Sequence, residues 1–129
     1  MDYKKLYDLA LDATKNAYTP YSHFNVGAAL LTEEGTVYTG VNIENSSYGG
    51  TICAERTAMV KAISEGHRRF KALAVAAVSE GKEHTSSPCG ICRQFIFEFG
   101  DDIDIIFGSD RDNLEVYKIK DLLPAGFRL

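Results

Sequence analysis

The longest purely apolar run in the sequence, Ala72 to Val78, places the tightest limit on the fold. Lys71 is the only charged residue between Phe70 and Val78, so this segment is predicted to be a central β-strand that is buried on both faces. A strand of this kind requires helices on both faces of its sheet, which indicates an α/β fold. The run is far too short to cross a bilayer, so no membrane-spanning segment is expected.

Helical and strand patterns alternate along the rest of the chain. Apolar residues three or four apart predict helices, and short apolar runs bounded by turn residues predict strands. The expected helices cover residues 2–19, 53–65 and 89–99, and the expected strands cover residues 26–31, 37–41, 70–78, 103–107 and 114–119. Thr51 is the expected cap of the second helix. This order predicts one domain, residues 1–129, folded as a three-layer α/β/α sandwich with a mixed five-stranded sheet.

The charge of the chain limits its partners. The net charge is −4 and the pI is about 5.3, which argues against a dedicated nucleic-acid-binding protein, because such domains are usually basic. One basic cluster, His67-Arg68-Arg69 with Lys71, is interpreted as a solvated loop after a helix. The N-terminal residues lack the apolar core of a signal peptide, so a cytoplasmic protein is expected.

Three cysteines carry the strongest chemical signal. Cys89 and Cys92 are three residues apart at a predicted helix start, so both thiolates can face one point, and Cys53 at the start of another helix can supply a third ligand. There is no fourth cysteine, and the three histidines show no metal-ligand spacing to these residues. A structural zinc site needs four protein ligands, whereas three ligands and a water are typical of a catalytic site. The sequence therefore predicts one catalytic Zn²⁺ per chain.

Two residues that follow Cys53 are candidates to complete this site. Arg56 lies on the same helical face, where its guanidinium can donate to the thiolate and offset part of its charge. Two helix N-termini aimed at the metal would offset more of that charge. Glu55 is the candidate for moving protons, but a helix places it roughly 200° around the axis from Cys53, so the sequence alone does not bring it to the metal.

Each of these residues also has a simpler interpretation. Cys89 and Cys92 could form a thiol redox pair. Cys53 alone would more often be a small core residue. Glu55 and Arg56 alone would more often be a first-turn acid and a surface cation. Only the combination favours a metal site.

The two cysteine segments resemble those of a known family. Cys53-Ala54-Glu55, followed by Pro88-Cys89-Gly90-Ile91-Cys92-Arg93-Gln94, is similar to the signature of the zinc-dependent cytidine deaminases of the small homotetrameric type. The first ligand is cysteine here, where the wider superfamily often has histidine. The resemblance extends from Tyr18 to Pro124. It implies the cytidine deaminase fold, a zinc cofactor, and hydrolysis of cytidine and 2′-deoxycytidine to uridine and 2′-deoxyuridine plus ammonia, in pyrimidine salvage.

The same resemblance implies roles for residues around the base and the sugar. Asn42 and Glu44 match residues that hold the ribose hydroxyls. Phe24 matches an aromatic residue that packs against the pyrimidine. The backbone N–H of Ala54 and the backbone carbonyl of Ser87 would contact the base. The sugar-binding segment, residues 41–48, holds one acid and no basic residue, which favours a nucleoside over a nucleotide.

Two further residues concern the assembly implied by the resemblance. Tyr48 and Phe127 match residues that reach a neighbouring subunit's site in a homotetramer, although a lone tail phenylalanine could equally be a local plug.

The resemblance also implies the role of Glu55. It would take a proton from water, pass it to N3 of the pyrimidine and then protonate the departing amine.

Two other functions remain open from the sequence. One is a related deaminase that acts on an aminopyrimidine antibiotic, a nucleotide or an RNA base. The other is a non-enzymatic protein, either a thiol-redox protein or an interaction module stabilised by zinc.

Overall fold

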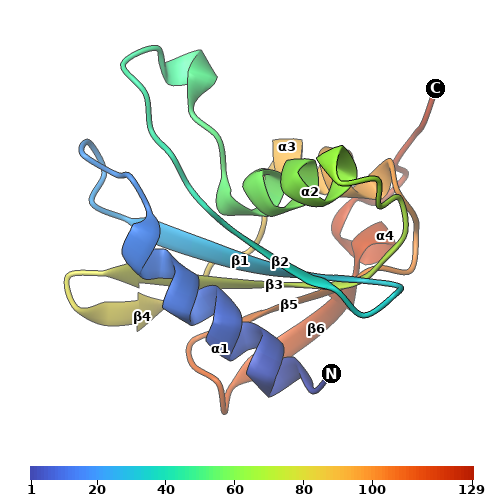
Figure 1. Cartoon of the computed structure of the whole chain (residues 1–129), viewed down its shortest axis with the longest axis horizontal. Coiled ribbons are helices and arrows are strands. Elements are labelled where there is room, and N and C mark those ends of the chain that lie inside the picture. The colour runs from blue at the N-terminus through green and yellow to red at the C-terminus, as the bar shows by residue number, and fades with distance from the viewer.

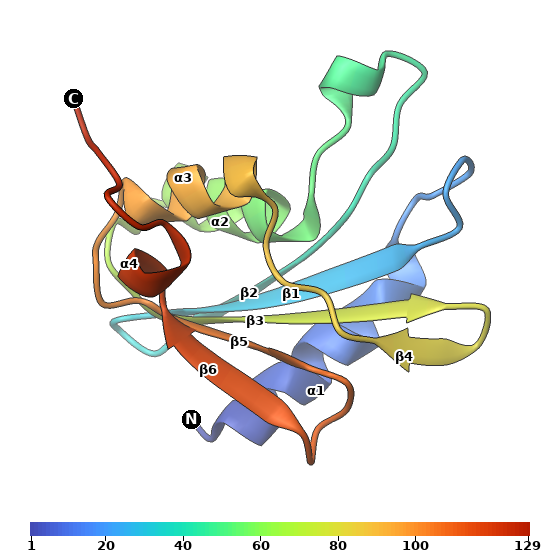
Figure 2. The ribbon, with the colours of Figure 1, turned by 180° about the vertical axis from the view of Figure 1, so that it is seen from behind.

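A mixed β-sheet forms the middle layer of the molecule, with one helix on one face and three on the other. The computed structural model describes residues 1–129, and Figures 1 and 2 show α1 crossing one face while α2, α3 and α4 lie against the opposite face. The elements are, in chain order, α1 (Tyr3–Ala13), η1 (Thr14–Asn16), β1 (Asn25–Thr32), β2 (Val37–Val41), η2 (Tyr48–Gly50), α2 (Ala54–Ser64), β3 (Phe70–Ser79), β4 (Lys82–His84), α3 (Gly90–Phe97), β5 (Asp104–Gly108), β6 (Leu114–Lys118) and α4 (Ile119–Leu122). The predicted three-layer α/β architecture is confirmed.

The sheet has the strand order β2-β1-β3-β5-β6, with β3 at its centre. β3 pairs antiparallel with β1 and parallel with β5, so the sheet is mixed as predicted. The strands β1 and β2 form a hairpin and pair antiparallel from Gly27↔Val41 to Leu31↔Val37. A sixth short strand, β4, pairs with the end of β3, so the predicted count of five strands was one too low.

Alternate side chains of the central strands divide the core into two parts. On β3, Leu73, Val75 and Ala77 pack toward α2 and α3, whereas Ala72 and Ala74 pack toward α1. The predicted burial of this strand on both faces is therefore confirmed. None of the helices combines the length and the apolar composition that a membrane-spanning segment needs.

Each of the two long helices approaches the sheet over a glycine. A Cβ atom on Gly27 of β1 would lie 2.0 Å from the carbonyl oxygen of Ala10 in α1. A Cβ atom on Gly40 of β2 would lie 2.4 Å from the backbone nitrogen of Ala58 in α2. Any side chain at either position would push its helix away from the sheet.

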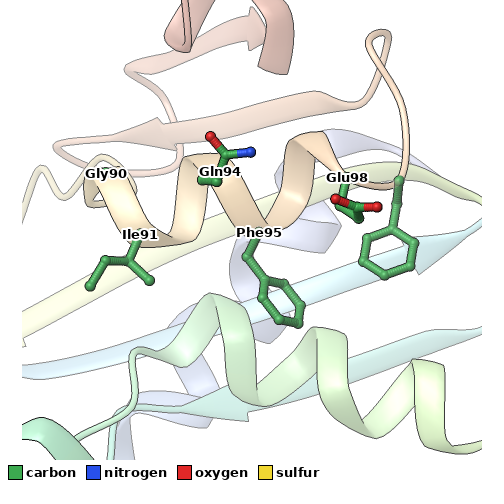
Figure 3. Close-up of a pocket in the computed structure, with 6 residues that line it drawn as sticks. Gly90, Ile91, Gln94, Phe95 and Glu98 are labelled. Atoms are coloured by element: carbon green, nitrogen blue, oxygen red, sulfur yellow. The ribbon is translucent and has the colours of Figure 1, made fainter. Parts of the chain in front are cut away.

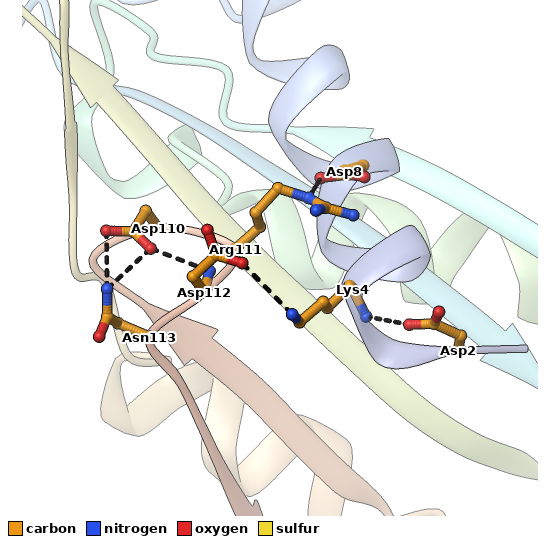
Figure 4. A network of polar contacts seen from close by, with 7 residues as sticks. All are labelled: Asp2, Lys4, Asp8, Asp110, Arg111, Asp112 and Asn113. Carbon is orange, nitrogen blue, oxygen red and sulfur yellow. Dashed lines mark hydrogen bonds and ion pairs between the residues drawn. The ribbon is translucent and has the colours of Figure 1, made fainter.

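An exposed polar network joins the start of α1 to the loop between β5 and β6 (Figure 4). Asp2 caps α1 by accepting a hydrogen bond from the backbone nitrogen of Lys4 at 2.7 Å. The side chain of Lys4 pairs with Asp112 at 3.2 Å, and Arg111 pairs with Asp8 at 3.1 Å. These contacts connect the loop to the helix on the side of the sheet away from α2.

Several predicted boundaries differ from the structure. The first helix ends at Ala13 and continues only as the short helix η1, and at this junction the Thr14 hydroxyl donates to the carbonyl of Leu11. Cys53, not Thr51, occupies the N-cap position of α2. Ile119 begins α4 instead of ending the last strand.

Candidate metal centre

The three cysteines meet where two helices begin. Cys53 is the N-cap residue of α2, Cys89 is the N-cap residue of α3, and Cys92 lies in the first turn of α3. Neither N-cap side chain bonds to its own helix, so both thiols are free to face the cluster. The three sulfur atoms all lie within 4.8 Å of one another.

The spacing of these sulfur atoms suits zinc. The Sγ atoms of Cys53 and Cys89 are 3.6 Å apart, and none of the three cysteines forms a disulfide. A tetrahedral zinc ion bonded to sulfur at about 2.3 Å would set its sulfur ligands about 3.8 Å apart. The residues present therefore fit a zinc ion with three thiolate ligands and one remaining position, and the predicted zinc cofactor is confirmed by this donor set.

Arg56 supplies positive charge to two of the three sulfur atoms. Its Nη2 atom donates to the Sγ atom of Cys53 at 3.5 Å, the contact that the helical spacing predicts. Its Nε atom donates to the Sγ atom of Cys92 at 3.4 Å, a contact that the spacing did not predict. One guanidinium thus bridges ligands from two different helices.

The close packing of the thiols gives Cys53 and Cys92 different pKa values. The pKa of Cys53 is lowered to about 5, because the Cys92 thiol donates to it and the guanidinium of Arg56 does the same. The pKa of Cys92 is raised, since its proton is held by Cys53 and its side chain is buried. A thiolate is thus favoured at Cys53 near neutral pH, which is the form that binds a metal.

Glu55 is buried beside this cluster. Only 4% of the residue is exposed, and burial raises the pKa of its carboxyl to about 7, although a bond from its own backbone N–H opposes that shift. The negative charge of Cys53 raises the pKa of Glu55 further. At neutral pH the carboxyl can therefore both release and accept a proton.

A cavity of about 150 Å³ opens beside the cysteine cluster. Glu55 lines it together with Cys53 and Cys89, so the structure brings the acid and two of the sulfur ligands to one space, which the sequence could not establish. The complete lining is Val26, Asn42, Thr51, Ile52, Cys53, Ala54, Glu55, Ser86, Ser87 and Cys89. Val26, Thr51, Ile52 and Ser86 were not predicted, because no motif marks them.

The family of the chain follows from comparison with known proteins. Residues 1–109 match the model of the family described as "Cytidine and deoxycytidylate deaminase zinc-binding region". The chain belongs to this family.

Individual relatives cover nearly the whole chain. The chain is 51% identical over 124 residues to a probable cytidine deaminase of Dictyostelium discoideum, covering 96% of this chain and 82% of the relative. It is 50% identical over 128 residues to a cytidine deaminase of Sporosarcina psychrophila, covering 98% and 92% of the two chains. The crystal structure of a cytidine deaminase from Burkholderia pseudomallei superposes with a TM-score of 0.90 at 40% identity, covering 98% of this chain and all of that one. The predicted resemblance to the cytidine deaminases is confirmed as family membership.

The residues predicted for the substrate of a cytidine deaminase fall into two groups. Asn42, Ala54 and Ser87 line the cavity. The amide of Asn42 donates to the carbonyl of Phe24 at 2.8 Å and accepts from the backbone nitrogen of Val26 at 2.9 Å. Because an amide offers two donors and two acceptor lone pairs, one donor and one lone pair of Asn42 remain for a ligand.

Glu44 and Phe24 lie outside the cavity lining. The carboxylate of Glu44 accepts bonds from the backbone nitrogens of Tyr21 and Ser22 at 3.0 and 3.1 Å, and from the Ser22 hydroxyl. The Ser22 hydroxyl is the main cause that lowers the pKa of Glu44. Phe24 is partly buried and its ring lies 5.7 Å from that of His84.

Tyr48 and Phe127 are also separate from the cavity within one chain. Tyr48 is 80% exposed and its ring lies 6.2 Å from that of Tyr21, in a loop that stands away from the body of the molecule in Figures 1 and 2. Phe127 is 64% exposed near the C-terminus. Their predicted roles therefore depend on a second chain.

Proposed function

We propose that this chain hydrolyses cytidine and 2′-deoxycytidine to uridine and 2′-deoxyuridine, with release of ammonia. The observation that carries the proposal is the position of Glu55, whose buried carboxyl lines the same cavity as Cys53 and Cys89. A proton carrier beside a three-thiolate zinc site is the arrangement that hydrolytic deamination requires.

Glu55 performs the proton transfers in this proposal. Zinc, when bound, supplies the Lewis acidity that makes a water molecule nucleophilic near neutral pH. Glu55 accepts a proton from that water and delivers it to N3 of the pyrimidine, which makes C4 electrophilic. A bond forms between C4 and the water oxygen, Glu55 transfers the second water proton to the exocyclic amino group, and the bond from C4 to that nitrogen breaks, so that ammonia leaves. A pKa of about 7 suits a group that must act as base and then as acid.

The surrounding residues hold the metal ligands and the substrate. Arg56 and the N-termini of α2 and α3 offset the negative charge of the thiolates. The backbone N–H of Ala54 and the carbonyl of Ser87 orient the base, and Asn42 uses its remaining donor and lone pair on the ribose hydroxyls. Glu44 assists at the ribose, and Phe24 covers the pyrimidine.

The chemistry of the cavity favours a nucleoside over a nucleotide. Neither lysine nor arginine lines it, so a phosphate would have no cation to bind. The reaction then belongs to pyrimidine salvage in the cytoplasm, where free nucleosides are reused.

We further propose that the protein is a homotetramer. An apolar groove lies along α3, formed by Gly90, Ile91, Gln94, Phe95, Glu98 and Phe99. Figure 3 shows Ile91 and Phe95 projecting from the same side of this helix, and Ile91 is 65% exposed. A second copy of the chain would cover this face and would bring Tyr48 and Phe127 to a neighbouring site.

Light scattering on a sizing column tests the assembly. Ile91→Glu should shift the wild-type tetramer to smaller species, because a charge would be buried in the interface. Leu9→Glu on α1 is the matched control, since Leu9 is also exposed but lies on the opposite face. A monomeric wild-type protein would contradict the proposal.

Ultraviolet monitoring of cytidine with and without a zinc chelator tests the reaction. We expect loss of cytidine and equimolar ammonia, both abolished by the chelator and restored by zinc. Parallel assays with dCMP, cytosine and single-stranded RNA identify the substrate class. One zinc per chain without ammonia from any of these would favour an interaction module instead.

A further inference from the structure

Arg93 is the residue of the cysteine motif for which the proposed reaction has no use. It follows the ligand Cys92 directly on α3, yet it bonds to none of the three sulfur atoms. Its guanidinium is partly buried and forms no ion pair with any acidic side chain. A cation in this position needs another explanation.

The guanidinium of Arg93 bonds three neutral acceptors from two distant parts of the chain. Nε donates to the carbonyl of Pro88 at 2.7 Å, and Nη2 donates to the hydroxyl of Ser87 at 3.3 Å. Nη1 donates to the carbonyl of Leu122, at the end of α4, at 3.0 Å. The planar fork of an arginine suits acceptors that lie in different directions, whereas the single ammonium of a lysine does not.

The first two acceptors belong to a wall of the cavity. Ser87 and Cys89 both line it, and the buried Pro88 lies between them in the sequence. A proline has no backbone N–H, so this segment has fewer backbone bonds with which to hold its own shape. The bonds from Arg93 therefore supply part of the restraint on Ser87 and Cys89.

The third acceptor is the last residue of α4, directly before the C-terminal tail, and the tail lies along α3 through further contacts. Gln94 donates from Nε2 to the carbonyl of Phe127 at 3.1 Å. Arg128 donates from Nε to the carbonyl of Phe97 at 2.7 Å, and its guanidinium carbon lies 4.0 Å from the centre of the Phe97 ring. The tail and the cavity wall are thus both attached to α3, and Arg93 is the side chain that contacts both.

We propose that Arg93 is a positioning residue that holds the Ser87–Cys89 wall of the cavity and the C-terminal tail in a fixed relation, and so sets how tightly the substrate is bound. The inference rests on the proposed function for its effect on substrate. Its effect on the two segments is independent of that function. Arg93 touches neither the metal ligands' sulfur atoms nor the carboxyl of Glu55, so it acts on binding more than on the chemical step.

Steady-state kinetics and hydrogen exchange of Arg93→Gln, on the zinc-loaded protein, test this inference. The KM for cytidine should rise at least tenfold while kcat falls less than threefold and zinc stays at one per chain. Amide exchange should become faster in both residues 85–90 and residues 122–127. Arg93→Lys should recover part of the KM, because an ammonium can still reach some of the acceptors.

Arg68→Gln is the matched control. Like Arg93, Arg68 bonds neutral acceptors; it donates to the backbone carbonyls of Ile63 and His67 at 2.8 Å, but at the far end of α2 and away from the cavity. This variant should leave KM and the exchange of both segments unchanged.

Three outcomes would overturn the inference. The first is a KM within twofold of wild type for Arg93→Gln, and the second is unchanged exchange in either segment. The third is failure of both Arg93 variants to fold, since Arg93 would then stabilise the whole domain instead of this wall. A wild-type protein that releases no ammonia from cytidine would contradict the proposed function alone, and the exchange data would still decide the role of Arg93.

Discussion

The two faces of the sheet use charged side chains in different ways. On the α1 face, cations pair with carboxylates in solvent, as Lys4 does with Asp112 and Arg111 does with Asp8 (Figure 4). On the α2 and α3 face, Arg56 bonds two sulfur atoms and Arg93 bonds carbonyls and a hydroxyl. Exposed ion pairs contribute about 0–1 kcal/mol to stability, because water and salt screen them. We therefore expect Arg56 and Arg93, which have no carboxylate partner, to matter more for function than Lys4 and Arg111.

The largest difference in kcat between the two faces is expected when one carboxylate on each face is replaced by an amide. Glu55→Gln should retain zinc but lower kcat by roughly 10⁴-fold, because an amide cannot carry the protons. The matched control is Glu83→Gln on β4, whose carboxylate accepts a bond from the Tyr7 hydroxyl of α1 at 2.8 Å, and its kcat should not change. Ammonia release and zinc content per chain are the measurements. A Glu55→Gln enzyme with more than a tenth of wild-type turnover would rule out the proton-carrying role.

Substitution of the two glycines should affect stability to a similar extent but activity to a different extent. Gly27→Ala and Gly40→Ala should each lower the free energy of unfolding by about 2–4 kcal/mol, since either Cβ would collide with a helix backbone. Only Gly40→Ala displaces α2, the helix that carries Glu55. We expect it to lose activity at temperatures where it is still folded, whereas folded Gly27→Ala should keep near wild-type kcat.

Chemical denaturation and kinetics at the same low temperature measure this pair. Equal losses of kcat in both variants would mean that the two helix contacts are mechanically linked through the sheet. The α1 face would then be part of the active site's support.

The arginines of the two faces should differ in their effect on zinc. Arg56→Gln should weaken zinc binding by about 10–100-fold, because two thiolates lose their cationic donor. Arg111→Gln removes a cation that is paired with Asp8 on the other face, and zinc affinity should stay within twofold of wild type. Competition with a chromophoric chelator gives both values. The assigned role of Arg56 fails if the two variants bind zinc equally well.

The smallest effect is expected at the exposed network of α1. Lys4→Ala should change the free energy of unfolding by less than about 0.5 kcal/mol, and less still in high salt, because both partners are solvated. Urea denaturation at two salt concentrations would measure this. A loss above 1 kcal/mol would show that the network in Figure 4 has a structural role that its exposure does not suggest.

Much of the fold could be predicted because local pattern and burial agree. The run from Phe70 to Ser79 forms the central strand, and the bounds of β2, Val37–Val41, match the prediction. Both ligand-bearing helices begin directly after a cysteine, within one residue of the predicted starts. In these elements the apolar spacing that the sequence displays is the same spacing that the core uses.

The elements that escaped prediction lack such a signal. The strand β4 is polar and wholly exposed, and its hairpin turn places Glu80 at φ 54° and Gly81 at φ 74°, where Asn-Gly would be the usual sequence. The helix α4 has four residues and no side-chain cap, so only its packing defines it. Intrinsic secondary-structure propensity predicts little where tertiary contacts decide the conformation.

In the candidate site, too, some features could be predicted from the sequence and others depend on tertiary contacts. The spacing of the cysteines in the sequence was sufficient to predict the sulfur cluster, because all three ligands lie at or beside the starts of the two helices. Spacing failed for Glu55, because its approach to the cavity depends on how α2 sits on β2 over Gly40. It also failed for the bonds that Asn42 makes to the start of β1, since these depend on the hairpin register.

The position of Cys53 and Cys89 has a consequence for how the chain folds. These ligands are 36 residues apart in sequence, and β3 lies between them. Closing a loop of that length in a disordered chain costs about 4 kcal/mol of conformational entropy. In the folded protein the sheet has already brought the two ends together, so zinc binds without that cost, and its binding energy becomes folding energy. Zinc supply would then govern how long the folded protein persists in the cell as well as its catalytic activity.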